Sequence, residues 1–260
     1  MSDKTPILEL RGVSKSFGAV QALYQVDFHV APGEVMALVG DNGAGKSTLI
    51  KCIAGIHPID EGEIVFEGET VTIHGPKDAA KLGIEVVYQD LALCDNLDVV
   101  QNMFLGREET SSLRALDETT MERRASDTLA TLSVTTIRSV RQTVAGLSGG
   151  QRQSVAVAKA VMWNSKVVIL DEPTAALGVA QTRQVLDLVK RLGQQGLAVV
   201  LISHNLHDIF EVADSITVLR LGQNVAEVKT RDVTQTQVVE AITAGALSKV
   251  PGVVEAEVTA

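Results

Sequence analysis

The segment that most constrains the fold is a short apolar run followed at once by a glycine-rich loop. Val35–Val39 has the composition of a buried strand, and Gly40–Ser47 fits G-x-x-x-x-G-K-[ST] at every fixed position. An apolar stretch with helical spacing begins near Lys46. A strand that turns tightly into a helix aims backbone N–H groups and the positive end of the helix dipole at one point, which favours phosphate. A glycine-rich turn that binds nothing is the alternative, but it has no need of Lys46 and Ser47.

Each residue of this loop has an expected task in binding a nucleotide. We expect Lys46 to reach the β- and γ-phosphates, Ser47 to hold Mg²⁺ and Thr48 to contact the α-phosphate. The rest of the loop is expected to surround the phosphates with its backbone; it comprises Gly40, Asp41, Asn42, Gly43, Ala44 and Gly45.

The other apolar stretches predict a single α/β domain around this loop. Near-continuous apolar runs at 84–88, 167–170 and 197–202 are typical of parallel strands covered on both faces, with helical stretches between them. Alternation over 7–10 and 23–30, and a hairpin around 64–66, predict an antiparallel β subdomain. Helical spacing after Leu91 predicts an inserted helical subdomain. We expect the domain to span residues 1–250, the helical subdomain roughly 91–162 and a loose tail 251–260.

Polar residues follow three of the predicted parallel strands. Because ligands gather at the carboxyl ends of such strands, Asp171 is expected to act on Mg²⁺ and Glu172 to act as general base, typically worth roughly 10² to 10⁴ in rate. Gln89 is expected to contact the metal shell or the attacking water, and His204 the γ-phosphate. Each alone has a plain alternative, because strand ends are often polar. Their joint placement around a phosphate loop favours catalysis.

A second anion site is predicted at Leu147-Ser148-Gly149-Gly150-Gln151, ahead of a predicted helix over 152–162. Ser148 as N-cap with Gln151 three residues later is a capping box, which is a sufficient local explanation. Two adjacent glycines at a helix start also expose backbone N–H groups to an anion. One loop already binds one triphosphate, so this site needs a phosphate that a second copy of the chain would supply.

These motifs resemble those of the ABC ATPase family. Residues 147–151 match its LSGGQ signature without a mismatch, and the phosphate loop (Walker A), Gln89, the Walker B segment 167–172 and His204 follow in the family's order over almost the whole chain. The resemblance implies a P-loop NTPase fold of the ABC type, with ATP and Mg²⁺ as cofactors. It implies a head-to-tail dimer in which Ser148, Gly149, Gly150 and Gln151 of one copy close over ATP held by the other. Phe17 matches the aromatic residue that stacks on adenine.

Two further stretches, 88–97 and 171–179, are similar to monosaccharide-import ATPases, particularly the single-cassette fructose-import type. That resemblance implies an integral-membrane permease as partner, a sugar-binding protein that delivers the substrate, and a peripheral place on the cytoplasmic face of the membrane. Most ABC proteins have an aspartate just after Leu177, where this chain has Gly178. Coupling between the two nucleotide sites is therefore expected to use other groups.

Composition separates the competing functions. A formal net charge of −9 argues against nucleic acid as a partner, and the two cysteines lack the spacing of a disulfide framework or zinc site. The apolar runs are shorter than the roughly 20 residues of a membrane helix, so a membrane role requires another chain. The import ATPase is the first hypothesis, and the ATPase of an ABC exporter is the second. Non-transport ABC ATPases usually have long coiled coils, fused paired cassettes or basic surfaces, and this sequence shows none of them. A kinase that uses the same phosphate loop would have no use for the LSGGQ segment.

Overall fold

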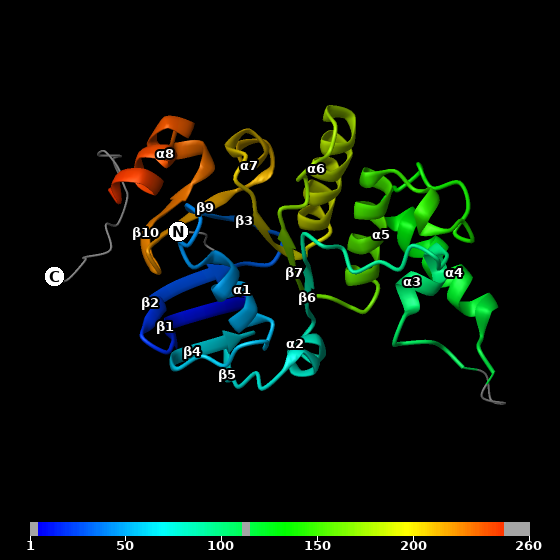
Figure 1. Cartoon of the computed structure of the whole chain (residues 1–260), viewed down its shortest axis with the longest axis horizontal. Coiled ribbons are helices and arrows are strands. Elements are labelled where there is room, and N and C mark those ends of the chain that lie inside the picture. Colours follow the sequence, from blue (N-terminus) through cyan, green and yellow to red (C-terminus); the bar gives the residue numbers. More distant parts are fainter. Residues whose placement is uncertain (1–4, 111–114, 247–260) are drawn as a thin grey trace.

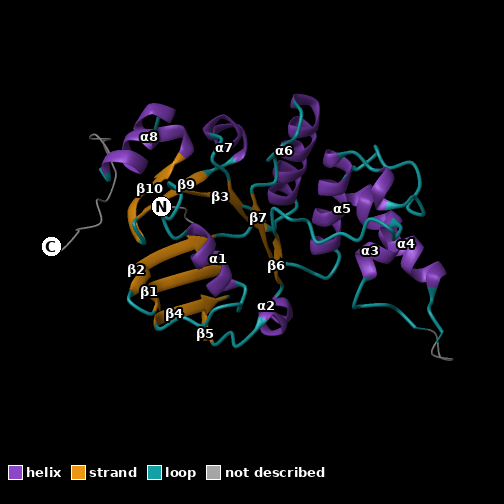
Figure 2. Cartoon of the chain, viewed as in Figure 1, coloured by secondary structure: helices purple, strands orange, loops and turns teal. Residues whose placement is uncertain are grey.

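Two β-sheets organise the part of the chain that the computed structural model describes, residues 5–110 and 115–246 (Figures 1 and 2). The smaller sheet is antiparallel, as predicted, with strand order β2-β1-β4-β5. Its strands are β1 (Leu8–Phe17), β2 (Val20–Val30), β4 (Glu61–Phe66) and β5 (Glu69–Val71). The tail expected at 251–260 lies outside the described residues.

The larger sheet has the strand order β10-β9-β3-β8-β7-β6 and is parallel except for β10. Its strands are β3 (Val35–Val39), β6 (Ile84–Val87), β7 (Val167–Asp171), β8 (Ala198–Ile202), β9 (Ser215–Arg220) and β10 (Gln223–Lys229). The apolar runs predicted β3, β6, β7 and β8. They missed β9 and β10, because buried Ser215 and Thr217 interrupt the apolar pattern of β9 and β10 is largely polar.

Helices cover this sheet and form a separate group at one end of the molecule (Figure 1). They are α1 (Lys46–Ile53), α2 (Pro76–Leu82), α3 (Val99–Phe104), α4 (Glu118–Thr131), α5 (Gly149–Val161), α6 (Val179–Gln194), α7 (Leu206–Val212) and α8 (Gln235–Ala244). The group at the end comprises α3, α4 and α5, which fall within the span expected for the helical subdomain. No helix in the two described ranges combines the length and apolar content needed to cross a bilayer.

The core lies on both faces of the larger sheet, which explains why its central strands are apolar without interruption. In β3, Met36 and Leu38 pack toward α1 and the antiparallel sheet. Val35, Ala37 and Val39 pack on the opposite side with the helices that follow β6 in the chain. Because β3 is buried on both faces, the loop that follows it starts from a rigidly held strand end.

Candidate functional site

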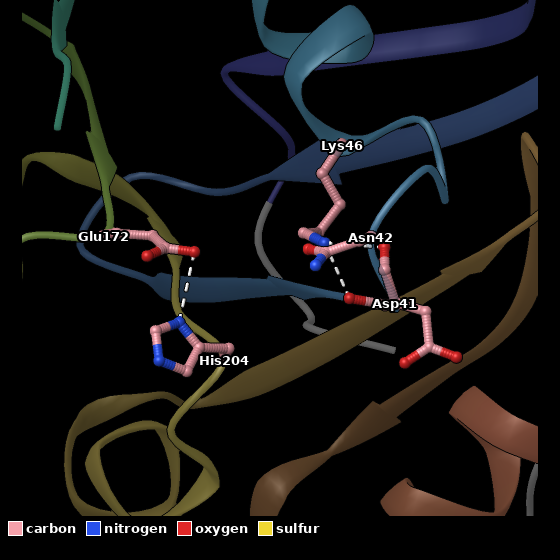
Figure 3. Close-up of a pocket in the computed structure, with 6 residues that line it drawn as sticks. Asp41, Asn42, Lys46, Glu172 and His204 are labelled. Carbon is pink, nitrogen blue, oxygen red and sulfur yellow. Dashed lines mark hydrogen bonds and ion pairs between the residues drawn. The ribbon is translucent and has the colours of Figure 1, made fainter. Parts of the chain in front are cut away.

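The phosphate loop, Glu172 and His204 meet at the carboxyl edge of the larger sheet. Strands β3, β8 and β7 are parallel neighbours, so the residues that follow them share one edge. The cavity there has a volume of about 430 Å³ (Figure 3). It is lined by Gly40, Asp41, Asn42, Lys46, Glu172 and His204. The structure thus brings together residues that the sequence predicted from three separate segments.

The phosphate loop is shaped by close contact with β2 of the antiparallel sheet and β9 of the larger sheet. Gly45 precedes α1 and has φ +103°, and a Cβ there would lie 2.8 Å from the carbonyl oxygen of Ala22 in β2. Gly40, at φ +153°, faces the carbonyl of Leu219 in the same way, with a Cβ distance of 2.2 Å. Only glycine fits these two positions. The strand, loop and helix therefore stand in the predicted order, and α1 begins at Lys46.

Lys46 is held over this loop by the loop's own backbone. Its Nζ donates hydrogen bonds to the carbonyl oxygens of Gly40 at 2.6 Å and Asp41 at 3.0 Å. Burial lowers the pKa of Lys46, while the carboxylates of Glu172, Asp41 and Asp171 oppose that effect. A cation partly withdrawn from water and bonded only to carbonyls gains from an anionic ligand, so the lysine is placed to exchange these carbonyls for phosphate oxygens.

The residues expected to hold a metal are Ser47, Asp171 and Gln89. Ser47 is exposed in the first turn of α1, and Asp171 is the last residue of β7. Burial and the neighbouring Glu172 carboxylate raise the pKa of Asp171, which a nearby cation would reverse. Gln89 is exposed two residues after β6, next to β7, but it is not among the residues that line the cavity.

A metal here would need its remaining ligands from a nucleotide. Within the described ranges, no group of three or more His, Cys, Asp or Glu side chains is placed to hold a metal ion. Mg²⁺ in nucleotide sites is usually bound by one or two protein groups together with phosphates and water. A serine and a carboxylate beside a phosphate loop fit that pattern.

Glu172 and His204 form a pair across the cavity (Figure 3). The Nδ1 atom of His204 lies 3.2 Å from Oε1 of Glu172, although Glu172 follows β7 and His204 follows β8. Glu172 has φ +49°, a left-handed conformation that costs a non-glycine residue about 1–2 kcal/mol. Its backbone N–H donates to the carbonyl of Ile202 at 2.9 Å, which continues the β7–β8 pairing into this turn. The sequence predicted both side chains but not their contact.

The signature segment starts α5 as a capping box, as its local sequence predicted. The Oγ of Ser148 accepts from the backbone N–H of Gln151 at 3.4 Å, and Oε1 of Gln151 accepts from that of Ser148 at 2.8 Å. The helix begins at Gly149, three residues earlier than predicted, because Ser148 already caps it. Gln151 also donates to the carbonyl of Thr136 at 2.6 Å, so its side chain braces the helix start. None of these residues lines the cavity.

Two other expected residues lie outside the cavity. Phe17 is next to the tip of the β1–β2 hairpin and is 44 % exposed, so it is not a core residue. Its ring is 5.0 Å from that of His57 in an edge-to-face contact, and the Nζ of Lys15 lies 5.6 Å from its centroid. Gly178 precedes α6 with ordinary backbone angles, and a Cβ there would meet nothing within 4 Å. The backbone therefore does not require glycine at this position.

The sequence analysis missed Asn102, which anchors the loop after Gln89. Asn102 lies in α3 and its side chain is fully buried. Its Oδ1 accepts from the backbone N–H of Cys94 at 2.7 Å, and its Nδ2 donates to the carbonyls of Cys94 and Asp98, both at 3.0 Å. The signal in the sequence was weak, because Asn102 is one of two adjacent amide residues in α3 and only the fold shows that it is the buried one.

Comparison with known proteins places this geometry in a family. The sequence model described as "ABC transporter" matches residues 23–175. The chain is 48% identical over 244 residues to the fructose import ATP-binding protein FrcA of Rhizobium meliloti, covering 92% of this chain and 94% of that protein. It is 47% identical over 250 residues to the xylose/arabinose import ATP-binding protein XylG of Sulfolobus acidocaldarius, covering 96% and 98%.

A solved structure shares the fold. The dimeric post-hydrolysis state of the ATP-binding cassette MJ0796, bound to ADP and Pi, superimposes with a TM-score of 0.71 at 26% identity, covering 87% of this chain and 100% of that one. The likeness therefore extends beyond the phosphate loop to nearly the whole cassette.

Proposed function

The chain belongs to the ABC transporter family, and we propose that it is the subunit that hydrolyses ATP to drive uptake of a monosaccharide through a separate permease. The observation that carries this proposal is the 48% identity to a fructose import ATP-binding protein along almost the full length of both chains. A xylose/arabinose import protein is nearly as similar, at 47%. Because these two relatives are named for different sugars, the similarity supports the class of substrate and not one sugar.

The cavity fits the triphosphate of ATP and a magnesium ion. Lys46 would exchange its bonds to Gly40 and Asp41 for phosphate oxygens, and the loop backbone and Thr48 would contact the remaining phosphates. Mg²⁺ neutralises the charge that develops on the phosphates. Ser47 and Asp171 would hold it, with Gln89 beside them. Asp171 is suited to this task because burial and the neighbouring Glu172 carboxylate raise its pKa, and a bound metal cation would offset both effects.

Glu172 and His204 are proposed to carry out the hydrolytic step. The Glu172 carboxylate would act as general base on the attacking water. With Nδ1 of His204 facing Oε1 of Glu172, an N–H at Nδ1 would donate to the carboxylate and fix the ring, and Nε2 would need a proton of its own to donate to an oxygen of the γ-phosphate. The pair therefore orients the base while contacting the group that reacts.

Turnover is proposed to require a second copy of the chain, arranged head to tail. Ser148, Gly149 and Gly150 lie outside their own chain's cavity and present the start of α5, which would close over ATP bound by the partner. Gln151 would serve this contact by bracing the helix start. The exposed ring of Phe17 would stack on the adenine. The dimeric structure of the MJ0796 cassette supports the formation of a dimer.

We further propose that the chain is peripheral to the cytoplasmic face of the membrane, where ATP is available, and that a sugar-binding protein delivers the substrate to the permease. The test is uptake of labelled fructose, xylose, arabinose and ribose by cells that lack this chain. Wild type should restore uptake of at least one sugar, whereas Glu172→Gln should not. If no sugar depends on the chain in a strain without redundant transporters, the import proposal is wrong and export becomes the next hypothesis.

A further inference from the structure

A buried carboxylate joins the two segments that carry Glu172 and His204. Asp208 lies in α7 and is only 4% exposed. Its Oδ2 accepts a hydrogen bond from Oγ1 of Thr174 at 2.7 Å, and its Oδ1 accepts one from Nδ2 of Asn205 at 2.9 Å. Thr174 is two residues after Glu172, and Asn205 directly follows His204. One side chain thus bridges the turn after β7 and the turn after β8.

The turn after β7 needs such an anchor. Glu172 is in a left-handed conformation, and strained residues of this kind persist only when their surroundings hold them. The turn is held on one side by the bond from the Glu172 backbone N–H to the Ile202 carbonyl. Beyond Glu172, the Thr174 hydroxyl is the side-chain link to α7. Loss of that link would release the end of the turn that lies beyond the general base.

The segment of His204 is less constrained by burial. The His204 side chain is 74% exposed, so packing does little to fix it. The next residue, Asn205, is held three times: its backbone N–H donates to Oγ of Ser203, its Oδ1 accepts from the backbone N–H of His207, and its Nδ2 donates to Asp208. Asp208 therefore accepts hydrogen bonds from both turns and fixes their positions relative to each other.

We propose that Asp208, acting through Thr174 and Asn205, is a positioning residue that holds Glu172 and His204 at their 3.2 Å contact. The inference rests on the proposed function, because it assumes that this pair acts in hydrolysis. A helix-capping role would explain the bond from Asn205, the N-cap of α7. It does not explain the bond from Thr174, which comes from a different segment 34 residues away.

The decisive comparison is Thr174→Val against Thr174→Ser. Valine keeps the shape but removes the donor to Asp208, whereas serine keeps the hydroxyl. Since a displacement of about 1 Å can cost about 100-fold in rate, we expect Thr174→Val to lower kcat by about 10- to 100-fold. Its ATP affinity should stay within about 2-fold, because the phosphate loop is unchanged. Thr174→Ser should recover most of the lost kcat.

The matched control is Ser215→Ala. Ser215 donates to Oε1 of buried Glu34 at 2.6 Å, so a hydroxyl again bonds a buried carboxylate, here at the amino ends of the strands of the larger sheet and with Lys229 bonded to both groups. This variant should lower the thermal midpoint without changing kcat. If Thr174→Val also changes only the midpoint, or if it weakens ATP binding as much as turnover, the positioning role is wrong.

A double-mutant cycle tests whether Thr174 acts through Asp208. Asp208→Asn should lower kcat as well, and in the double variant the second substitution should add about 2-fold or less. Fully multiplicative losses would show that the two residues act separately. If Asp208→Asn does not fold, the comparison of Thr174→Val with Thr174→Ser decides whether the positioning role is correct. Glu172→Gln separates the two hypotheses: full turnover in that variant refutes the proposed function, whereas its loss together with an active Thr174→Val refutes only the positioning role.

Discussion

Gly45→Ala should destabilise the protein more than Gly43→Ala, although both glycines belong to the phosphate loop. Both have positive φ, +103° and +82° respectively, so alanine is strained at either position. They differ in their surroundings. A Cβ on Gly45 would lie 2.8 Å from the backbone carbonyl oxygen of Ala22 and 2.8 Å from Cδ2 of Leu23, whereas a Cβ on Gly43 would meet nothing within 4 Å.

The expected magnitudes follow from these contacts. The left-handed conformation costs about 1–2 kcal/mol for either alanine. At Gly45 the added methyl also overpacks a sheet, which costs typically about 1–3 kcal/mol, because the Ala22 carbonyl belongs to β2 and cannot move independently. We therefore expect a loss of about 1–2 kcal/mol for Gly43→Ala and about 2–5 kcal/mol for Gly45→Ala.

The assay is urea unfolding followed by circular dichroism, with thermal midpoints as a second measure. For a chain of this size, each 1 kcal/mol corresponds to about 2–4 °C in the midpoint. Gly45→Ala should also lose ATP affinity, since relief of the clash displaces the start of α1 and Lys46 with it. Equal unfolding free energies for the two variants would refute the argument that Gly45 is required by packing against β2.

Three other substitutions test the remaining parts of the site. Ser148→Arg should leave ATP binding to the monomer unchanged but abolish ATPase activity, because it obstructs the start of α5; normal turnover would exclude a role of the signature in the partner's site. Asp171→Asn should be more stable than wild type in urea without Mg²⁺ at pH 7–8. Burial and Glu172 raise the pKa of Asp171 in the folded state, so the cost of its ionised form is fully present above that pKa and disappears as the pH falls below the unfolded value of about 3.9. The difference should shrink toward pH 4, and a wild type that is the more stable at pH 8 would contradict this cause. Gly178→Asp should fold normally and gain a few tenths of a kcal/mol as an N-cap of α6, which thermal unfolding can measure; a lower midpoint would show a contact that the open space around Gly178 does not predict.

The sequence predicted those structural features that are formed by residues close together in the chain. The phosphate loop and the capping box at Ser148 are complete within eight and four residues respectively, and both have the predicted form. The uninterrupted apolar runs of the parallel strands predicted a sheet covered on both faces, and therefore the edge where the polar residues meet.

The parts that sequence reasoning missed depend on contacts between distant segments. Strand β9 is buried yet contains Ser215 and Thr217, whose hydroxyls find partners in Glu34 and Met36, both 181 residues away. Such partners cannot be recognised from a local pattern, and without them the two hydroxyl residues interrupt the apolar run that would have predicted a buried strand. The bond between Thr174 and Asp208 escaped prediction for the same reason. In each case the buried polar side chain is tolerated because the fold brings a hydrogen-bond partner to it from a distant segment.

Three unfavourable features of this chain lie together at the carboxyl edge of the larger sheet. Glu172 has a strained backbone, Asp171 a carboxyl whose pKa is raised by burial, and Lys46 an ammonium whose pKa is lowered by burial. Other non-glycine residues also have positive φ, such as Glu67 in the turn between β4 and β5. Glu172 differs because its strained backbone carries a carboxylate close to Asp171 and Lys46, two groups whose pKa values are themselves shifted. A cation at Asp171 and an anion at Lys46 would relieve both pKa shifts at once, so one ligand that supplies both charges, a metal-bound triphosphate, is what this arrangement of residues best accommodates.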